Sequence, residues 1–284
     1  MLAPIITEII HRVRLKLTCG GVMSAITALN SYRHRGFIDS VEVLAPDAAR
    51  EFAAQFDTLV EREGIDLLAP SFQLHDRHLD RDFIWSVATS PSVLDVIDAL
   101  VGPNILMLGS RFIVKPPQST LGVPWHRDAD YAGLYPCSQV NVWLAVDEVD
   151  DDNGCLRVLP RVAAEHAEAR AHTAADPSDA NLVDQQLALA DEERAALVSL
   201  PLRGGCMTVF DGNLVHGSEA NVSSRRRCGL AMRYTSASTK LLNEGQWAAV
   251  CVRGTADRQG GRVISREQAR TFTYRKIDKF GAQA

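Results

Sequence analysis

The chain has 284 residues, of which 46% are hydrophobic, and it carries a formal net charge of −5. A chain of this length can bury the core of one large domain, and its acidic balance leaves no basic surplus to bind a nucleic-acid backbone. No apolar run reaches the roughly 20 residues needed to cross a bilayer, so the sequence predicts a protein whose partners are neither nucleic acid nor membrane.

The N-terminal segment is predicted to lie outside the main domain. We expect an N-terminal extension over residues 1–30 and a single domain over 31–284. Residues 1–22 place apolar side chains before basic ones and lack a small-x-small cleavage pattern, which is the reverse of a secretory signal. They are typical of a short amphipathic helix, a disordered tail or an over-extended start ahead of Met23.

The cysteines indicate a reducing compartment. They lack the C-x-x-C pairing of a metal or redox motif, and most lie in apolar stretches: Cys19, Cys137, Cys155, Cys206, Cys228 and Cys251. Reduced, buried thiols are the expected state, and together with the missing signal pattern they favour a cytoplasmic protein.

Two helices are predicted in the N-terminal third of the chain. The segment from Tyr32 reads as a leading stretch followed by a strand, and Pro46 then opens a helix that ends near Gly64. A second helix begins with Ser90 as its N-cap and stops at Gly102. Each helix carries one apolar stripe, so each should pack on a sheet.

The remainder of the chain consists mainly of short β-prone runs separated by turn residues. Seven such runs follow one another: ILMLGSRFIVK, VPWHRD, QVNVWLAVDEV, CLRVLP, CMTVF, LVHGS and GLAMRYTS. This succession indicates a mainly β fold with flanking helices, either a barrel or a jelly roll. An Ala-, Asp- and Glu-rich insertion at about 161–200, helical near 161–170 and 191–198, is either a lid that contacts substrate or a passive excursion.

A candidate metal site combines the triplet His126-Arg127-Asp128 with the distant His216. On a strand, residues i and i+2 point to the same side, so His126 and Asp128 can reach one ion while Arg127 points away. An Asp-Gly hairpin signal at 211–212 would place His216 on the outgoing arm of a tight β-hairpin. Two imidazoles and one carboxylate form a three-point face for one metal and leave the opposite positions open for chemistry.

A second metal site is not expected. The HDRH segment offers His75 and His78, but no carboxylate or cysteine stands at a matching offset. We expect both histidines to lie in a surface loop.

Three ordered motifs resemble the phytanoyl-CoA dioxygenase family of iron(II)- and 2-oxoglutarate-dependent oxygenases. They are IVKPPQSTLGVPWHRDADY, NVWLAVDEVDDDNGCLRVLP and HGSEANVSSRRRCGLAMRY, and the similarity spans about residues 31–236. The resemblance implies a double-stranded β-helix, which is a jelly roll with helices packed on one sheet. It also implies that His126, Asp128 and His216 bind Fe(II), with 2-oxoglutarate and O2 as cosubstrates.

The resemblance further assigns residues to a 2-oxoglutarate site. Arg227, eleven residues after His216, is expected to bind the distal carboxylate, because a planar guanidinium matches a carboxylate bidentately. Arg225 shares its strand face and is the rival for this role. Ser218 and Lys115 are expected to lie beside the same carboxylate, although a turn serine or an edge lysine needs no such role.

A neighbouring strand face is expected to complete the site. Trp143 occupies the aromatic position of the family there, although a core tryptophan explains it equally well. Gln139 and Asn141 share that face as weaker candidates, and the Asn-Gly-Cys-Leu turn at 153–156 is interpreted as a hairpin that sets strand register. Five further residues are candidates for substrate contact: Gln118, Trp125, Asp130, Tyr131 and Tyr135.

These residues predict an oxygenase that hydroxylates an unactivated C–H bond of a small metabolite, as in natural-product tailoring, and releases succinate and CO2. Asp128 argues against halogenation, because halogenating relatives replace this carboxylate with a small residue. Desaturation, epimerisation and cyclisation are alternatives, as are a metal-dependent hydrolase and a non-redox metal-binding jelly roll. A buried dicarboxylate clamp formed by Arg227 and Lys115 would favour the oxygenase, while substrate identity and oligomeric state stay open.

Overall fold

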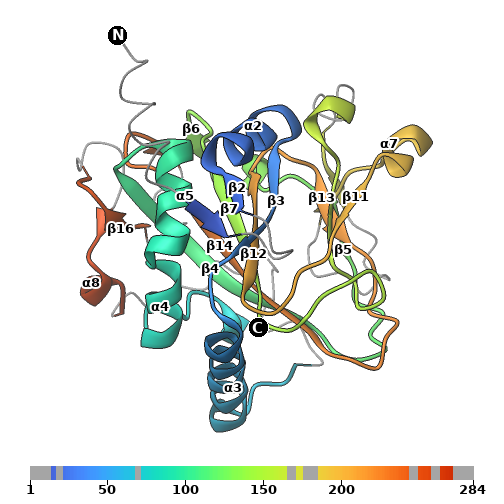
Figure 1. Cartoon of the computed structure of the whole chain (residues 1–284), viewed down its shortest axis with the longest axis horizontal. Helices are drawn as coiled ribbons and strands as arrows, with labels where there is room; N and C mark the ends of the chain where they lie inside the picture. Colours follow the sequence, from blue (N-terminus) through green and yellow to red (C-terminus); the bar gives the residue numbers. More distant parts are fainter. Residues whose placement is uncertain are drawn as a thin grey trace, which may run out of the picture.

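Two sheets that share a hydrophobic core form the centre of the molecule (Figure 1). The computed structural model describes residues 14–16, 22–67, 72–164, 171–174, 185–242, 249–256 and 263–270. The large sheet has the strand order β17-β16-β4-β14-β7-β12-β3, and the small sheet has the order β11-β8-β13-β5. Neighbouring strands are antiparallel except β16 and β17. This arrangement is the mainly β jelly roll with flanking helices that the sequence predicts.

The strands of the large sheet are β3 (Phe37–Glu42), β4 (Ile105–Lys115), β7 (Val140–Ala145), β12 (Cys206–Asp211), β14 (Arg227–Ser236), β16 (Ala249–Arg253) and β17 (Val263–Ile264). Those of the small sheet are β5 (Val123–His126), β8 (Leu156–Val158), β11 (Val198–Leu200) and β13 (His216–Ser218). Three two-stranded ribbons pair β1 (Arg14–Lys16) with β2 (Val22–Ser24), β6 (Leu134–Tyr135) with β15 (Lys240–Leu241), and β9 (Thr173–Ala174) with β10 (Gln185–Gln186). The helices are α2 (Ala25–Arg35), α3 (Pro46–Glu63), α4 (Asp82–Ala88), α5 (Pro91–Val101), α6 (Ala129–Ala132), α7 (Asp191–Ala195) and α8 (Arg266–Arg270), with short 3-10 turns η1 (Phe72–Leu74) and η2 (Arg161–Ala163).

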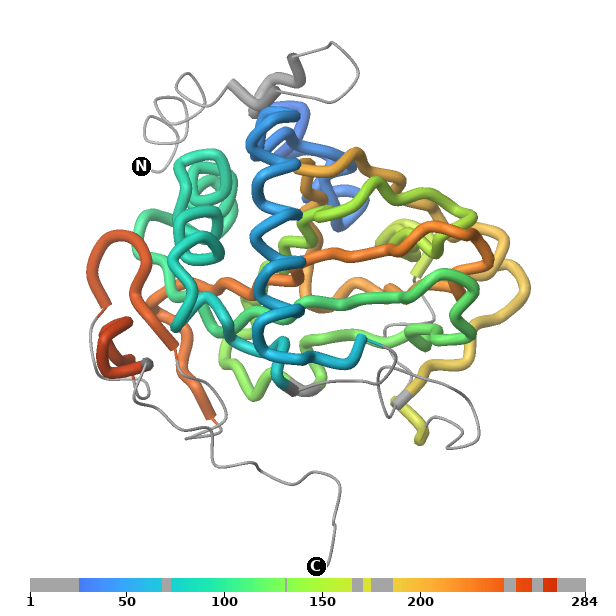
Figure 2. The backbone as a smooth tube through the Cα atoms, turned by 90° about the horizontal axis from the view of Figure 1, so that it is seen from below, coloured from blue at the N-terminus to red at the C-terminus, as the bar shows by residue number. Residues whose placement is uncertain are grey.

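Helices cover the outer face of the large sheet (Figure 2). Helix α3 places Phe52 and Phe56 on Phe112 of β4, with ring centroids 6.4 and 4.5 Å apart. This contact buries the apolar stripe that the sequence predicts, and Gly64 ends the helix in the left-handed conformation at φ 61°. Helix α5 also matches its predicted bounds, although the Ser90 side chain makes no capping hydrogen bond.

Helices α2, α4, α6 and α8 were not predicted. Helix α2 contains residue 30, where we expected the extension to end, and its Ala28 and Tyr32 are buried in the main core. Helix α4 lies beside α5, and the two are bent by 44° relative to each other. No single helix in the described ranges is long and apolar enough to cross a membrane, and only this bent pair passes on length and composition.

Both predicted hairpins are wrong. The turn at 211–212 leads from β12 in the large sheet to β13 in the small sheet, and the turn at 153–156 leads from β7 to β8 in the same way. Gly154 adopts φ 78°, and an added Cβ would lie 2.5 Å from the Glu219 carbonyl oxygen and 3.1 Å from Lys115 Nζ. The turn therefore packs tightly against Lys115 and the backbone at Glu219, and it does not set the register of a hairpin.

The insertion covers the outer face of the small sheet. Leu187 and Leu189 pack with Trp125 and Val215, and the Leu187 N–H donates to the Trp125 carbonyl at 2.7 Å. The predicted helix at 191–198 is shorter, because β11 begins at Val198. Most of the helix predicted at 161–170 lies outside the described residues, which there show only η2.

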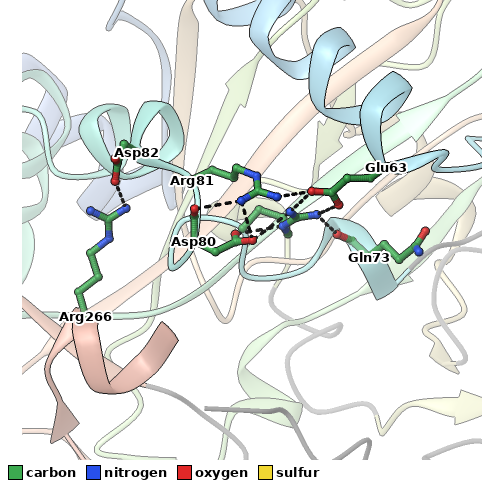
Figure 3. Close-up of polar contacts among 7 residues, drawn as sticks. Glu63, Gln73, Asp80, Arg81, Asp82 and Arg266 are labelled. Carbon is green, nitrogen blue, oxygen red and sulfur yellow. Dashed lines mark hydrogen bonds and ion pairs between the residues drawn. The ribbon is translucent and has the colours of Figure 1, made fainter. Parts of the chain in front are cut away.

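A network of ion pairs holds the segment between α3 and α4 (Figure 3). Arg77 contacts both carboxylate oxygens of Glu63 at 2.7 Å and Asp80 at 3.0 Å, and its hydrogen bonds lower the pKa of Glu63 to about 2. His78, in the same segment, is 1% exposed, and its Nδ1 is 2.7 Å from Ser110 Oγ. The prediction of a surface loop is therefore wrong for His78, while His75 is partly buried beside β4.

Candidate metal and cosubstrate site

Two adjacent strands of the small sheet bring the three candidate metal ligands together. His216 on β13 is the direct register partner of His126 at the end of β5, and Asp128 follows at the start of α6. One ligand atom from each residue lies within 4.8 Å of the others, and His126 Nε2 is 3.6 Å from Asp128 Oδ1. The pairing of β13 with β5, and not a hairpin of β12 and β13, thus brings His216 next to His126.

Backbone carbonyls orient both imidazoles for metal binding. His126 Nδ1 is 2.8 Å from the Pro124 carbonyl oxygen, and His216 Nδ1 is 2.9 Å from that of Leu214. Because a carbonyl can only accept, each Nδ1 carries the proton and each Nε2 keeps its lone pair for a metal. Burial, and then the neighbouring His126, lower the pKa of His216 to about 3, which keeps this imidazole neutral.

Asp128 is held in its charged form by an arginine that the sequence reading did not single out. Arg233 on β14 places Nε 3.3 Å from Asp128 Oδ2. Burial alone would raise the pKa of Asp128, but the Arg233 guanidinium holds that pKa well below its ordinary value. The donor set is therefore two neutral imidazoles and a carboxylate, which suits a ferrous ion with open coordination positions.

A buried arginine lies on the large sheet. Arg227 is 1% exposed, its guanidinium carbon is 4.5 Å from the centroid of the Trp143 ring, and its Nε and Nη1 have no hydrogen-bond partner among the described residues. Burial lowers the pKa of Arg227 to about 10, so it stays charged at neutral pH. An unpaired buried guanidinium is costly, so this pocket suits an anion that would complete its hydrogen bonds.

Lys115 and Ser218 lie next to this arginine. Lys115 is the register partner of Arg227, and its Nζ donates to Ser218 Oγ at 2.7 Å and to the Glu219 carbonyl. Burial, and then Arg227, lower the pKa of Lys115 to about 6. A dicarboxylate placed here would meet the Arg227 guanidinium, the Lys115 amino group and the Ser218 hydroxyl, so the residues present fit 2-oxoglutarate.

Strand β7 and Gln139, the residue before it, add buried polar atoms whose hydrogen bonds are not all made. Gln139 Nε2 donates to Asn141 Oδ1 at 2.8 Å. Gln139 Oε1, Asn141 Nδ2 and Trp143 Nε1 are buried and have no hydrogen-bond partner in the described part of the chain. These atoms complete a polar strip on the large sheet, and Trp143 is also a member of the core between the sheets, as the alternative interpretation held.

Other sequence-predicted residues lie elsewhere. Arg225 is exposed and pairs with Asp150 at 2.5 Å, so it does not share the Arg227 pocket. Trp125 packs in the cluster under the insertion, on the strand face opposite His126. Asp130 is bound to Arg127 and His172. Gln118 and Tyr135 are exposed, and the side chain of Tyr131 lies outside the described set.

The fold and the metal site together define the class of this protein. A jelly roll that carries an open face of two histidines and one carboxylate beside a buried cationic pocket is a non-haem oxygenase scaffold. The chain belongs to the phytanoyl-CoA dioxygenase (PhyH) family, whose model matches residues 32–229. It is therefore an enzyme of the Fe(II)- and 2-oxoglutarate-dependent oxygenase class.

Relatives and solved structures agree with this assignment. The chain is 27% identical over 237 residues to the peroxisomal phytanoyl-CoA dioxygenase of Homo sapiens, which covers 75% of this chain and 68% of that protein. It superposes on the non-heme monooxygenase ThoJ in its apo form with a TM-score of 0.69 at 24% identity, over 85% of this chain and 91% of that chain. For the epimerase SnoN in complex with Fe3+, alpha ketoglutarate and nogalamycin RO, the TM-score is 0.61 at 19% identity, over 77% and 86% of the two chains. At these identities the two structures support the fold alone.

Proposed function

We propose that the protein hydroxylates an unactivated C–H bond of a small metabolite and converts 2-oxoglutarate to succinate and CO2. The observation that carries the proposal is Arg227, a buried guanidinium with unfilled hydrogen bonds on the sheet that faces the metal ligands. An arginine with only a structural role would be paired, because buried N–H groups without hydrogen-bond acceptors lower the stability of the fold. Bound iron supplies dioxygen activation and the removal of hydrogen from carbon.

The side chains of the pocket have separable roles in this proposal. Arg227 binds the distal carboxylate of 2-oxoglutarate, and Trp143 holds the guanidinium plane from one side. Lys115 and Ser218 donate to the same carboxylate. His126, Asp128 and His216 hold the metal, and the apolar residues between the sheets exclude water from the reacting atoms.

The nature of the product is part of the proposal. Asp128 is present as a third protein ligand, which supports hydroxylation over halogenation. Epimerisation, desaturation and cyclisation use the same pocket, and the similarity to SnoN keeps an epimerase-type outcome as the second candidate. A hydrolase or a non-redox metal-binding jelly roll has no use for a buried Arg227 with unfilled hydrogen bonds beside Lys115.

We also place the protein in the cytoplasm, supported by its five described cysteines, which are all free.

Succinate release tests the reaction. Enzyme with Fe(II), 2-oxoglutarate and oxygen should form succinate, and a true substrate from a metabolite panel should raise that rate and gain one oxygen atom from isotopically labelled dioxygen. Arg227→Ala should lose most succinate formation, whereas the matched control Arg225→Ala should retain it. Absence of succinate above the enzyme-free background would contradict the assignment as an oxygenase. An oxidised product that carries no labelled oxygen would contradict hydroxylation and indicate epimerisation, desaturation or cyclisation.

A further inference from the structure

The inner face of the large sheet carries a second arginine that the 2-oxoglutarate pocket does not use. Arg111 on β4 lies on the same strand face as Lys115, because side chains alternate along a strand. The intervening Phe112 and Val114 belong to the helix-covered core, which places Arg111 on the side of the small sheet. Its side chain is partly buried and makes no hydrogen bond or ion pair with any described residue.

A third guanidinium lies close to Arg111. Arg111 is the register partner of Ala231 on β14, and Arg233 is two residues further along the same face. Burial, and then Arg233, lower the pKa of Arg111 to about 10. Burial, and then these two arginines, lower the pKa of the adjacent His75 to about 3, so His75 adds no positive charge.

Around Arg111 and Arg233, the positive charge of the two guanidinium groups exceeds the negative charge of the nearby carboxylate. Among the described residues, Asp128 is the one carboxylate whose charge acts on Arg111, and Arg233 already contacts it at 3.3 Å. Asp128 is also a proposed metal ligand, and a bound cation would neutralise more of the negative charge that Asp128 could offer to Arg111. Holding Asp128 in place therefore explains Arg233 but does not explain Arg111.

The distal carboxylate of the 2-oxoglutarate proposed for the pocket is not the missing anion. Arg233 lies six residues beyond Arg227 on β14, which is about 20 Å of extended chain, and Arg111 lies four residues before Lys115, which is about 13 Å. The distal carboxylate of a five-carbon diacid held at Arg227 and Lys115 is therefore remote from the Arg111 group, and its other end would be taken up by the metal. The Arg111 group thus lies beside Asp128, away from the Arg227 end of the site.

We propose that Arg111, assisted by Arg233, binds an anionic group of the substrate, a carboxylate or a phosphate. The inference rests on the proposed function and names the substrate class: an acidic small metabolite whose reacting C–H bond lies between its anionic group and the metal. A guanidinium fits both oxyanions because its N–H groups form a planar fork.

The test measures substrate binding apart from chemistry. The protein with Fe(II) and 2-oxoglutarate is titrated without oxygen against a panel of aliphatic and cyclic carboxylic acids, the corresponding phosphate monoesters, and the matched neutral amides and alcohols. The readout is the change in the visible absorption band of the Fe(II)–2-oxoglutarate chelate when a compound binds beside the metal. Arg111→Gln is compared with Arg225→Gln, an exposed arginine outside the pocket.

Wild type and Arg225→Gln should respond to at least one acid or phosphate ester and to none of the neutral partners. Arg111→Gln should form the same chelate band with unchanged 2-oxoglutarate affinity, and its affinity for the responding anion should fall by at least about tenfold, as expected for a lost charged hydrogen bond. The proposal is overturned if neutral partners bind as well as anions, if no anion gives a response, or if Arg111→Gln binds like wild type. Absence of the chelate band in wild type contradicts the proposed function instead.

Discussion

Three consecutive arginines show how local environment decides what a side chain does. Arg225 is exposed and pairs with Asp150, and Arg226 contacts Asp147 at 2.8 Å and lies over the Phe56 ring. Arg227 is the first residue of β14 and is buried on Trp143 without an acidic partner in the described chain. Strand alternation left Arg225 and Arg227 as alternatives, because alternation does not show that β14 begins only at 227.

Replacing Arg227 by lysine tests the geometry of the clamp. Lysine keeps the charge but loses the planar fork, so about 1.5–3 kcal/mol of charged hydrogen bonding should be lost. The KM for 2-oxoglutarate in succinate formation should rise about 10- to 100-fold, whereas Arg225→Lys should leave it unchanged. An unaltered KM in Arg227→Lys would show that this guanidinium does not bind the cosubstrate.

Lys115 should make 2-oxoglutarate binding dependent on pH. Its pKa is about 6 in the free pocket, because burial and then Arg227 disfavour the charge, and a bound dianion would raise it. Above pH 6 binding must therefore take up a proton, so affinity should fall with rising pH by up to about tenfold per unit. Isothermal titration in buffers of different ionisation enthalpy measures this uptake. Lys115→Met should bind more weakly and without the proton uptake, and a slope that persists in this variant would assign it to another group.

At the scale of elements, the Trp143 ring of β7 lies across β14 because residue 229 is glycine. A Cβ at Gly229 would overlap the six-membered ring of Trp143 on the neighbouring strand. Gly229→Ala should therefore displace the indole on which Arg227 stacks and destabilise the fold by about 1–3 kcal/mol, the usual cost of overpacking. Thermal unfolding measures this, and Gly229→Ala combined with Trp143→Leu should recover part of the loss. A neutral Gly229→Ala would mean that the ring moves freely.

The insertion is fastened to the metal-binding strand by His172. Its Nε2 accepts the backbone N–H of Arg127 at 3.1 Å, and its Nδ1 lies 2.9 Å from Asp130 Oδ2. Arg127 stands between the two ligands of the triplet, so His172→Ala should loosen both and weaken Mn(II) binding about 10- to 100-fold, as for other supports of metal ligands. Competition with a chelator gives the affinity. Binding equal to wild type would reduce the insertion to a passive cover.

Sequence patterns predicted an element well where all of the signals for it lie within or directly beside that element. The bounds of α3 and α5 follow from an apolar stripe, a proline near the start and a glycine at the end. The turns at 211–212 and 153–156 carry hairpin residues, but a turn does not specify which sheet receives the next strand, and both cross between sheets. The role of His172 depends on tertiary contact between the insertion and β5, which no short-range spacing encodes.

At the scale of the whole molecule, the jelly roll explains why so much of the site could be predicted. Each sheet presents every second residue to the space between them, so His126, His216, Lys115 and Arg227 follow from alternation and from the family motifs. The same alternation could have found Arg111, four residues before Lys115, and Arg233, six after Arg227. It could not show that Arg233 contacts Asp128, because that contact depends on how the two sheets face each other.

Anaerobic titration with Fe(II) and 2-oxoglutarate tests the central claim most directly. The account predicts a visible chelate band in the wild type, its loss in His126→Ala, where a metal ligand is missing, and a rightward shift of the 2-oxoglutarate titration in Arg227→Ala. A wild-type protein that forms no band, or two variants that titrate like the wild type, would contradict the assignment of this pocket to iron and 2-oxoglutarate.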